Sequence, residues 1–599
     1  MIENETFGRV LLNQQLPEAY KVTGELTKKS FNKSMAAFAK KAPMEYGEAI
    51  SKMKHLGDQI ATTEGLSVGL EDIEPDYKER DRVMKPFTAR FTAAKTDDKR
   101  RGIVEEAQEA MQESAKTHSG SLTFQVRSGA RGNAVQHSNM VSAVGYARDP
   151  SGRAEPWLIR RSYAEGLKPS DYYATSNQSL MDVIKTHTEV SVPGEMAKKL
   201  VANMSAQVIT EEDCGTHNGI LMDSKSPDVV DRFLARDEGS FKRNTLITPV
   251  NQGKLAKSKH QILVRSPMSC EAGDGVCKRC QGLDEKGKMH HVGTHVGIRA
   301  AQAMAEPLTQ FALNAKHGGR TLKSDRFQVH GIQGFRQILE TPQQFINKAT
   351  LSNVDGTVKK IEDAPQGGHF VTVVDEKHYV TPNLGVVVKV GEKVERGDAL
   401  SEGIPRPDEV VSRKGLGSGR LYVVNTIHNI YKNQGKDLDR RHVELLARSN
   451  MNHVRVLKDP SNTYIKGDIL LYNNLRSDLS KNTKHVALKD ALGEVLGKEY
   501  FQYSVGTRVT PATIAFLKSQ KVKEVWIAPR APSIEFVMKP ATSAPKYNPD
   551  WLARMSHQGL KETIQRAATQ GDVSNIHGTH PVPAYAYGAE FGEGEEGRY

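Results

Sequence analysis

The sequence predicts a multidomain α+β protein that combines helical modules, a metal-binding element and small β-rich domains. A length of 599 residues is too great for a single hydrophobic core. Apolar residues recur at three- and four-residue spacing in much of the first 208 residues and again after residue 420, whereas short β-branched runs dominate between 349 and 400. All four cysteines lie between residues 214 and 280, which predicts a metal site.

The composition indicates an intracellular protein. The formal net charge of +12 favours a polyanionic partner such as nucleic acid, but this excess alone is weak support for one. No run approaches the roughly 18 consecutive apolar residues of a membrane helix, and the N-terminal residues MIENETFGRV have neither the basic nor the apolar region of a secretory signal. Four cysteines are too few for a disulfide scaffold in so long a chain.

The N-terminal part predicts helices joined by loops. Residues 35–65 are helical in pattern, and residues 77–118 resemble a charged helical hairpin in which Pro86 is the clear breaker. In residues 127–136 two glycines bracket Arg131, which predicts a turn where the backbone approaches another group.

Residues 180–207 show a long helical pattern with an interruption in its middle. Its apolar positions fall at helical spacing on both sides of Val192-Pro193-Gly194. Pro193 has no N–H for the carbonyl four residues back, so we expect a kink or a break there. Two separate helices joined by a turn are an equally good interpretation.

The cysteine spacing predicts a closed metal site. Cys277-x2-Cys280 forms a knuckle in which two thiolates converge on one ion, Cys270 arrives from the same loop, and Cys214 supplies the fourth sulfur. Four thiolates leave no open coordination position, so the predicted zinc is structural. Any of four histidines is an alternative to Cys214, at positions 217, 290, 291 and 295.

The segment after the ligands predicts a helix of small residues. Val296, Ala300 and Met304 share one face, and Glu306-Pro307 is expected to end or bend the helix. Residues 310–319 contain further helix formers and close on Gly318-Gly319, which indicates a hinge or stop.

The remainder alternates between β-rich and helical patterns. Strands are expected within 349–361, 369–380 and 385–400, followed by helix at 420–455 with an interruption at Gly435. A second β-like piece at about 486–527 and a helix near 551–570 precede a Gly- and Glu-rich tail, 588–599, that we expect to be disordered.

These motifs, in this order, resemble the C-terminal half of the largest catalytic subunit (β′) of bacterial-type multisubunit DNA-dependent RNA polymerase. The specific strings are 264-VRSPMSCEAGDGVCKRCQG-282 and 297-GIRAAQAMAEPLTQ-310. Weaker matches are 6-TFGRVLL-12, 64-EGLSVGLEDI-73, 128-SGARGNAVQ-136, 210-TEEDCGTHNGI-220, 335-FRQILE-340, 392-EKVERGDALSEG-403 and 548-NPDWLARMSHQ-558.

The resemblance implies a division of the chain within a larger crab-claw assembly. The implied regions are a helical funnel- or rim-like region (1–126), a loop-rich segment leading to the active cleft (127–178), the bridge helix (179–208), a zinc-binding region (209–295), the trigger loop (296–328), a β-rich jaw-like region (329–420), a C-terminal clamp or cleft region (421–587) and the tail (588–599).

The resemblance also implies roles for individual residues. Gln310 is expected near the sugar of the incoming nucleoside triphosphate, Leu313 against its base and His317 toward its phosphates, with Asn314 beside them. Nucleic-acid-facing positions are Arg131 and, in the bridge helix, Val190, Ser191, Val192 and Gly194. The chain departs from the family at Asn314, where an Arg is usual, and at Leu308, where a Gly is usual.

One family motif is absent. The chemistry of this family uses Mg²⁺ ions held by an aspartate string of the form DFDGD, and this chain contains none. We therefore expect a split subunit. Its expected protein partners are an N-terminal β′-like subunit with the magnesium aspartates and β-like subunits, and a promoter-specificity subunit is a further candidate. Its other expected partners are DNA template, RNA product and nucleoside triphosphates.

Split subunits of this kind occur in jumbo-bacteriophage, cyanobacterial and plastid polymerases. The compact length and divergent trigger loop favour a phage enzyme, located in the host cytoplasm, in a phage-made compartment or in the virion. The alternative function is a stand-alone zinc-stabilised nucleic-acid-binding protein. The trigger-loop string discriminates against this alternative, because simple binding does not require that string.

Overall fold

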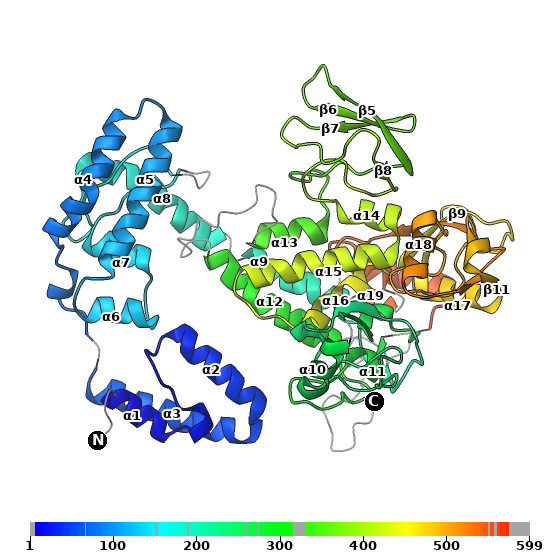
Figure 1. The fold of residues 1–599 in the computed structure, drawn as a ribbon, viewed down its shortest axis with the longest axis horizontal. Helices are drawn as coiled ribbons and strands as arrows, with labels where there is room; N and C mark the ends of the chain where they lie inside the picture. The colour runs from blue at the N-terminus through cyan, green and yellow to red at the C-terminus, as the bar shows by residue number, and fades with distance from the viewer. Residues whose placement is uncertain are drawn as a thin grey trace. The chain divides into compact units, whose positions relative to one another are not determined.

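The computed structural model describes residues 6–65, 67–149, 154–188, 191–258, 260–273, 275–314, 331–548, 551–555 and 560–573 (Figure 1). The tail at 588–599 lies outside these residues. The described residues form α-helices and several small sheets, so the predicted α+β class is confirmed. The chain divides into two compact units, with the boundary between Thr188 and Glu189, and each unit is described by itself.

Unit 1 is built from helices. Their bounds are α1 (Phe7–Gln14), α2 (Lys28–Lys41), α3 (Pro43–Thr63), α4 (Tyr77–Ala93), α5 (Asp97–Ala115), α6 (Ser121–Ser128), α7 (Ala134–Val141) and α8 (Pro169–Thr188). Thr27 caps α2 by accepting a hydrogen bond from the Ser30 N–H, and the Ser30 side chain accepts one from the Thr27 N–H. Phe38 of α2 is fully buried and stacks on Tyr20, which closes a small core over α3.

The hairpin predicted at 77–118 is present as α4 and α5, but the expectation that Pro86 breaks it was wrong. α4 runs through Pro86 without a break. The Pro86 side chain is exposed, so water can reach the carbonyl that loses its hydrogen-bond donor. Met84 packs against Ala107 and Met111 of α5 and holds the helix next to the proline. Packing therefore overrides the local helix-breaking tendency.

The turn predicted around Arg131 is also present. It joins α6 to α7, and Gly129 and Gly132 adopt φ values of 77° and 70°, which other residues rarely do. A Cβ on Gly129 would lie 3.1 Å from the Cβ of Lys28, so the backbone does approach another group here. Arg131 itself is exposed.

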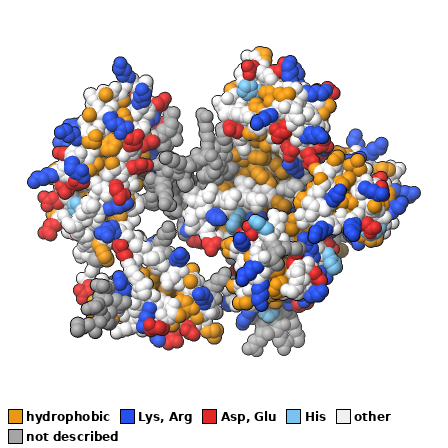
Figure 2. Space-filling view, in the orientation of Figure 1, with side chains coloured by type: hydrophobic (Ala, Val, Ile, Leu, Met, Phe, Trp, Pro, Cys, Tyr) orange, Lys and Arg blue, Asp and Glu red, His pale blue; other side chains and the backbone are white. Residues whose placement is uncertain are grey.

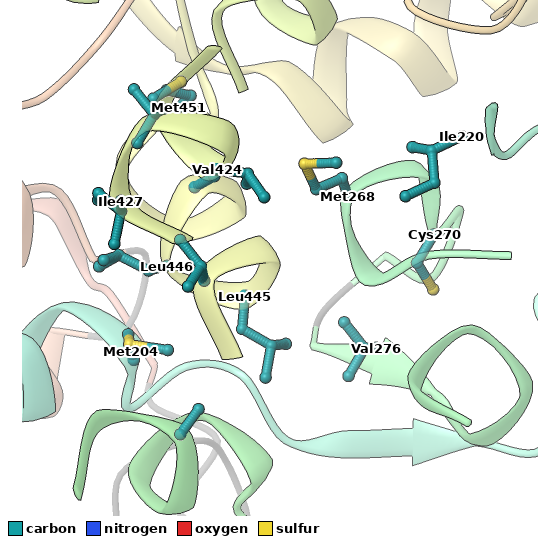
Figure 3. Close-up of a cluster of buried hydrophobic side chains, with 14 of the residues drawn as sticks. Met204, Ile220, Met268, Cys270, Val276, Val424, Ile427, Leu445, Leu446 and Met451 are labelled. Carbon is teal, nitrogen blue, oxygen red and sulfur yellow. The ribbon is translucent and has the colours of Figure 1, made fainter. Parts of the chain in front are cut away.

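Unit 2 contains a core of packed helices. Helices α9 (Ser191–Met204), α12 (Val296–Asn314), α13 (Gly331–Glu340), α15 (Leu416–Asn433) and α16 (Arg440–Asn450) contact one another. Figure 3 shows part of this core, where Val424 and Ile427 of α15 and Leu445 and Leu446 of α16 lie with Met204 of α9. The remaining helices of this unit are α10 (Pro249–Ser258), α11 (Lys278–Gln281), α14 (Pro407–Lys414), α17 (Tyr472–Lys481), α18 (Pro511–Ser519), α19 (Trp551–Met555) and α20 (Leu560–Gln570).

An ion pair is sealed inside this core. Glu444 of α16 accepts two hydrogen bonds from the Arg232 guanidinium, at 2.7 and 2.8 Å, and one from the Ser266 hydroxyl at 2.7 Å. Both charged side chains are at most 1% exposed. Burial raises the pKa of Glu444, but the opposing charge and hydrogen bonds of Arg232 lower this pKa below its ordinary value.

The strands of unit 2 form small sheets around the helices. Two of the pairs adjoin the cysteines: β1 (Ile209–Glu211) with β4 (Val276–Cys277), and β2 (Ile220–Asp223) with β3 (Gln261–Val264). Later in the chain, a three-stranded sheet contains β9 (His453–Lys458), β10 (Ile469–Leu471) and β13 (Ser533–Val537). A further pair joins β11 (Lys484–Ala487) to β12 (Glu524–Ile527).

The β-rich module predicted after residue 349 has its own core. It contains β5 (Gly356–Asp363), β6 (His369–Val373), β7 (Glu376–Val380) and β8 (Lys393–Val394), in the order β7-β6-β5-β8. The strands expected at 369–380 are confirmed as the hairpin of β6 and β7. The expected strand at 385–400 is only the two-residue β8 with isolated bridges, because glycines at 391 and 397 adopt φ values of 90° and bend the backbone.

The exposed surface is mixed in charge. Figure 2 shows Lys and Arg side chains interspersed with Asp and Glu over the visible face of the molecule. None of the helices in the described ranges is both long enough and apolar enough to cross a membrane.

Candidate functional site

Four cysteines from distant parts of the sequence converge in unit 2. Cys214 follows β1, Cys270 follows a short 3-10 turn, Cys277 ends β4 and Cys280 lies in α11. The parallel pairing of β1 with β4 brings Cys214 to the other three. All four sulfur atoms lie within 4.8 Å of one another. The site thus depends on a strand pair whose members are more than 60 residues apart.

The geometry fits one tetrahedral metal ion. An ion bound by four thiolates at about 2.3 Å separates neighbouring sulfurs by about 3.8 Å, and the sulfurs of Cys214 and Cys280 are 3.7 Å apart. The backbone N–H of Cys277 donates to the Cys270 sulfur and that of Cys280 to the Cys277 sulfur, both at 3.3 Å. Three of the cysteines are buried and Cys214 is half-buried.

Among the described residues, no histidine belongs to this cluster, so the structure favours Cys214 over the histidine alternatives. No other group of three or more His, Cys, Asp or Glu residues in the described ranges is arranged to share a metal ion. Hydrogen bonds, the largest from Cys270, hold the pKa of the Cys214 thiol far below its usual range. Burial raises the pKa of the Cys270 and Cys280 thiols well above its ordinary value, so the four thiols do not titrate alike, and the arrangement of the sulfurs is what supports a metal site.

Arginines fasten the cysteine loop to the helical core. Arg448 of α16 is buried and donates at 2.8–3.3 Å to the backbone carbonyls of Pro267, Cys270, Ala272 and Gly275. Arg441, seven residues earlier on the same helix, donates to the carbonyls of Gln281 and Leu283. Neither residue was predicted from the sequence, although a spacing of seven on a helix places them on the same side.

Helices α9 and α12 pack closely where α9 ends and α12 begins. A Cβ on Gly297 would lie 2.8 Å from the Gln207 Cβ and 2.9 Å from the Met204 carbonyl carbon, so only glycine fits at this contact. The Gly297 N–H donates to the Gln207 carbonyl at 2.8 Å. The loop before α12 is tied to β1, because the Ile209 N–H donates to the Thr294 carbonyl at 3.0 Å.

Pro307 does not end α12, which corrects one of the two expectations for this helix. The helix continues to Asn314. The Tyr431 hydroxyl donates to the Met304 carbonyl at 2.7 Å, in the turn before the proline, where backbone hydrogen bonding is weakened. Leu308, where the family usually has glycine, is fully buried in the core of unit 2 and anchors the following turn.

The other predicted site residues are placed as follows. Gln310, Leu313 and Asn314 belong to the last turns of α12, while His317 lies outside the described residues. Val190 also lies outside them; Ser191, Val192 and Gly194 are in the first turn of α9, with Ser191 and Gly194 exposed. Pro193 is in that same turn. Its missing N–H costs no hydrogen bond there, because the first N–H groups of a helix have no partner within the helix. Arg131 belongs to unit 1.

Comparison with known proteins relates the chain to one family. Residues 166–468, just over half of the chain, match the family described as RNA polymerase Rpb1, domain 5. Similar curated proteins include the DNA-directed RNA polymerase subunit beta' of Staphylococcus aureus strains Mu50 and N315, each 26% identical over 475 residues. The similarity covers 73% of this chain and 39% of each relative, so the chain spans about two fifths of the length of these relatives.

The predicted resemblance to a C-terminal β′ region is therefore confirmed, and the matched residues include the four cysteines, α9 and α12. The chain belongs to the RNA polymerase Rpb1 domain 5 family.

Proposed function

We propose that this chain is a subunit of a multisubunit DNA-directed RNA polymerase and takes part in nucleotide addition through α9 and α12. The observation that carries the proposal is the close pairing of these two helices at Gly297, within the family match and tied to the cysteine cluster through β1. The similar protein of Staphylococcus aureus is named as a subunit, beta', of DNA-directed RNA polymerase.

In this proposal α9 belongs to the bridge helix and α12 begins the trigger loop. Leu313, Asn314 and His317 then close over the incoming nucleoside triphosphate, near its base and phosphates, while Gln310 lies near its sugar. Closure excludes water and orients the attacking hydroxyl toward the phosphorus, which is how positioning accelerates an in-line phosphoryl transfer. Asn314 brings an amide rather than a charge to this task.

The metal of the four-cysteine site is proposed to be zinc, held by Cys214, Cys270, Cys277 and Cys280. A Zn²⁺ ion in a closed tetrathiolate site stabilises the fold and has no open position for chemistry. Its role here is to lock β1 to the 270–280 loop and thus to fix the adjoining ends of α9 and α12. Substituting Cys277 with Ser is expected to release the ion, and full metal content in that variant by elemental analysis would contradict the assignment.

The magnesium-binding aspartates are proposed to come from another subunit. The sequence has no string of the form DFDGD, and among the described residues no carboxylate cluster is arranged to share a metal ion. Leu180, Val183 and Ile184 lie within four residues of one another on α8 and are each more than 40% exposed. Such an apolar helix face supports contact with a further polypeptide. We propose an N-terminal β′-like subunit and β-like subunits as the partners, as in a split phage polymerase, with DNA, RNA and nucleoside triphosphates bound between them.

The proposal is tested by reconstitution. The purified chain alone, supplied with template, nucleoside triphosphates and Mg²⁺, is expected to make no RNA. Addition of the copurifying subunits, one of them carrying clustered aspartates, is expected to restore template-directed synthesis. RNA synthesis by the isolated chain would contradict the split arrangement, and zinc-dependent DNA binding without any activity in the complete complex would favour a stand-alone nucleic-acid-binding protein.

The trigger-loop role is tested in the same complex. His317→Ala is expected to slow nucleotide addition at saturating nucleoside triphosphate while leaving assembly intact. His291→Ala is the matched control, because His291 is an exposed histidine outside α12. Equal rates for both variants would remove the proposed role of His317.

A further inference from the structure

Arg265 is a fully buried arginine whose guanidinium points at the cysteine cluster. Its Nη2 lies 3.2 Å from the Cys214 sulfur, 3.3 Å from that of Cys280 and 3.5 Å from that of Cys277, and its Nε lies 3.4 Å from the Cys280 sulfur. The side chain is 0% exposed. It contacts three of the four sulfurs; among the described contacts none joins it to Cys270.

These distances place the guanidinium on one face of the sulfur tetrahedron. An atom at the centre would lie about 2.3 Å from every sulfur, whereas Nη2 is at least 3.2 Å from three of them. Nη2 therefore caps the triangular face formed by Cys214, Cys277 and Cys280 from outside. The central position stays free for a metal ion, and Cys270 is the ligand opposite the capped face.

The other side of the guanidinium is held by fixed polar groups. Nη1 lies 2.6 Å from a carboxylate oxygen of Asp213 and donates to the Asn244 side-chain oxygen at 2.8 Å. Asp213 also pairs with Arg279 at 3.3 Å. Because both ends of the planar guanidinium are engaged, Arg265 cannot turn away from the sulfurs without losing several charge-assisted hydrogen bonds.

The charge balance explains why a cation belongs at this place. A divalent ion with four thiolates carries two net negative charges, and three of these sulfurs are buried at 0–1% exposure. Burying uncompensated charge is costly. Arg265 supplies one positive charge at contact distance, and its N–H groups stabilise three of the sulfurs as thiolates. Both effects disfavour protonation of these ligands, which is the step that would release the metal.

We propose that Arg265 is a positioning residue of the metal centre: it caps the Cys214–Cys277–Cys280 face, offsets part of the negative charge of the centre and thereby sets how tightly the metal is held. This inference rests on the metal site in the proposed function. The structure assigns no such contact to Arg279, which touches Asp213 but no sulfur among the described residues.

The test compares full-length chains with the substitutions Arg265→Met, Arg265→Lys and Arg279→Met. Zinc affinity is measured by competition with a chromophoric chelator, and each chain is also loaded with Co²⁺ for absorption spectroscopy. Arg265→Met is expected to lower zinc affinity about ten- to a hundredfold. Its sulfur-to-cobalt charge-transfer band is expected at longer wavelength, because thiolates that lose hydrogen bonds and a nearby cation give up electrons more easily.

Arg265→Lys keeps the charge but replaces the forked guanidinium by one compact ammonium group. Its zinc affinity and the wavelength of its cobalt band are therefore expected to lie between those of the wild-type chain and Arg265→Met. Arg279→Met is expected to match the wild-type chain in both readouts. The cobalt band also reports on the sulfurs themselves, so it separates the proposed role from a general loss of stability.

The possible outcomes distinguish the two proposals. A wild-type chain without tightly bound zinc overturns the metal centre and this inference with it. A zinc-loaded wild-type chain whose Arg265→Met and Arg265→Lys variants bind zinc equally well, with an unchanged cobalt band, overturns the role of Arg265 alone. If Arg265→Met fails to fold, an unshifted cobalt band in Arg265→Lys likewise overturns that role.

Discussion

Gly297→Ala is expected to separate α9 from α12. The added Cβ would lie 2.8 Å from the Gln207 Cβ, 2.9 Å from the Met204 carbonyl carbon and closer still to the Met204 carbonyl oxygen. Ordinary carbon contacts begin near 3.4 Å, so the backbones must move apart to admit the methyl group. The obstacles are mainly backbone atoms, which cannot rotate aside as a side chain can.

The cost follows from this geometry. Overpacking a close contact costs about 1–3 kcal/mol. We place this case near the upper end, because moving the backbones apart would also weaken the 2.8 Å hydrogen bond from the Gly297 N–H to the Gln207 carbonyl. A loss of about 3 kcal/mol corresponds to roughly a hundredfold change in an equilibrium constant. Local opening of α9 and α12 is therefore expected to become about a hundredfold more frequent.

Hydrogen–deuterium exchange measures this opening directly. Peptides from residues 191–208 and 296–314 are expected to exchange about a hundredfold faster in Gly297→Ala, with little change in the separate β5–β8 module. The matched control is Gly253→Ala in α10, where a Cβ meets nothing within 4 Å. That variant is expected to be neutral or more stable by up to about 1 kcal/mol, because alanine favours helix. Unchanged exchange at 296–314 in Gly297→Ala would refute the reasoning.

Three further changes test the packing of unit 2. Glu444→Gln leaves Arg232 buried without its countercharge and is expected to destabilise the unit by about 3–5 kcal/mol, seen as a lower thermal midpoint; an unchanged midpoint would contradict this. Tyr431→Phe removes the donor to the buried Met304 carbonyl and is expected to cost about 1–3 kcal/mol, again by thermal unfolding, with no loss as the adverse result. Burial, then the nearby Lys539 charge, lowers the pKa of His453 to about 4. Because the unfolded state binds this proton first, stability should fall as pH drops from about 6.5 to 4, by about 3 kcal/mol in the full interval; the same acid profile in His453→Leu would show that another group is responsible.

Local signals in the sequence predicted the elements that depend on local backbone chemistry. The interruption at Gly435 separates α15 from α16, and this glycine has a φ of 70°, which few other residues adopt. The hairpin at 369–380 formed because alternating side chains and a tight turn are encoded within twelve residues. Met196, Leu200 and Met204 are buried together, as their helical spacing indicated.

Features that depend on distant contacts were not predictable in the same way. The β1–β4 pair joins two strands of three and two residues, too short to leave a periodic pattern. Pro86 and Pro307 both lie inside helices because packing around them outweighs the lost hydrogen bond. Arg265 lies within the family-like string 264–282, but no role could be assigned to it from the sequence, since arginine is usually exposed and only its position against the sulfurs shows what it does.

The same contacts limit where the proposed catalytic motion can occur. α12 is held at its start by the Gly297 hydrogen bond and by the tie between Thr294 and β1, and in its middle by the Tyr431 hydroxyl. Phe311 is 4% exposed and its ring lies 5.1 Å from that of Tyr431. Moving Met304, Leu308 or Phe311 would break core contacts. Under the proposed function, closure over the nucleotide must therefore come from the chain after Phe311, while the metal centre and α9 hold the base of the loop still.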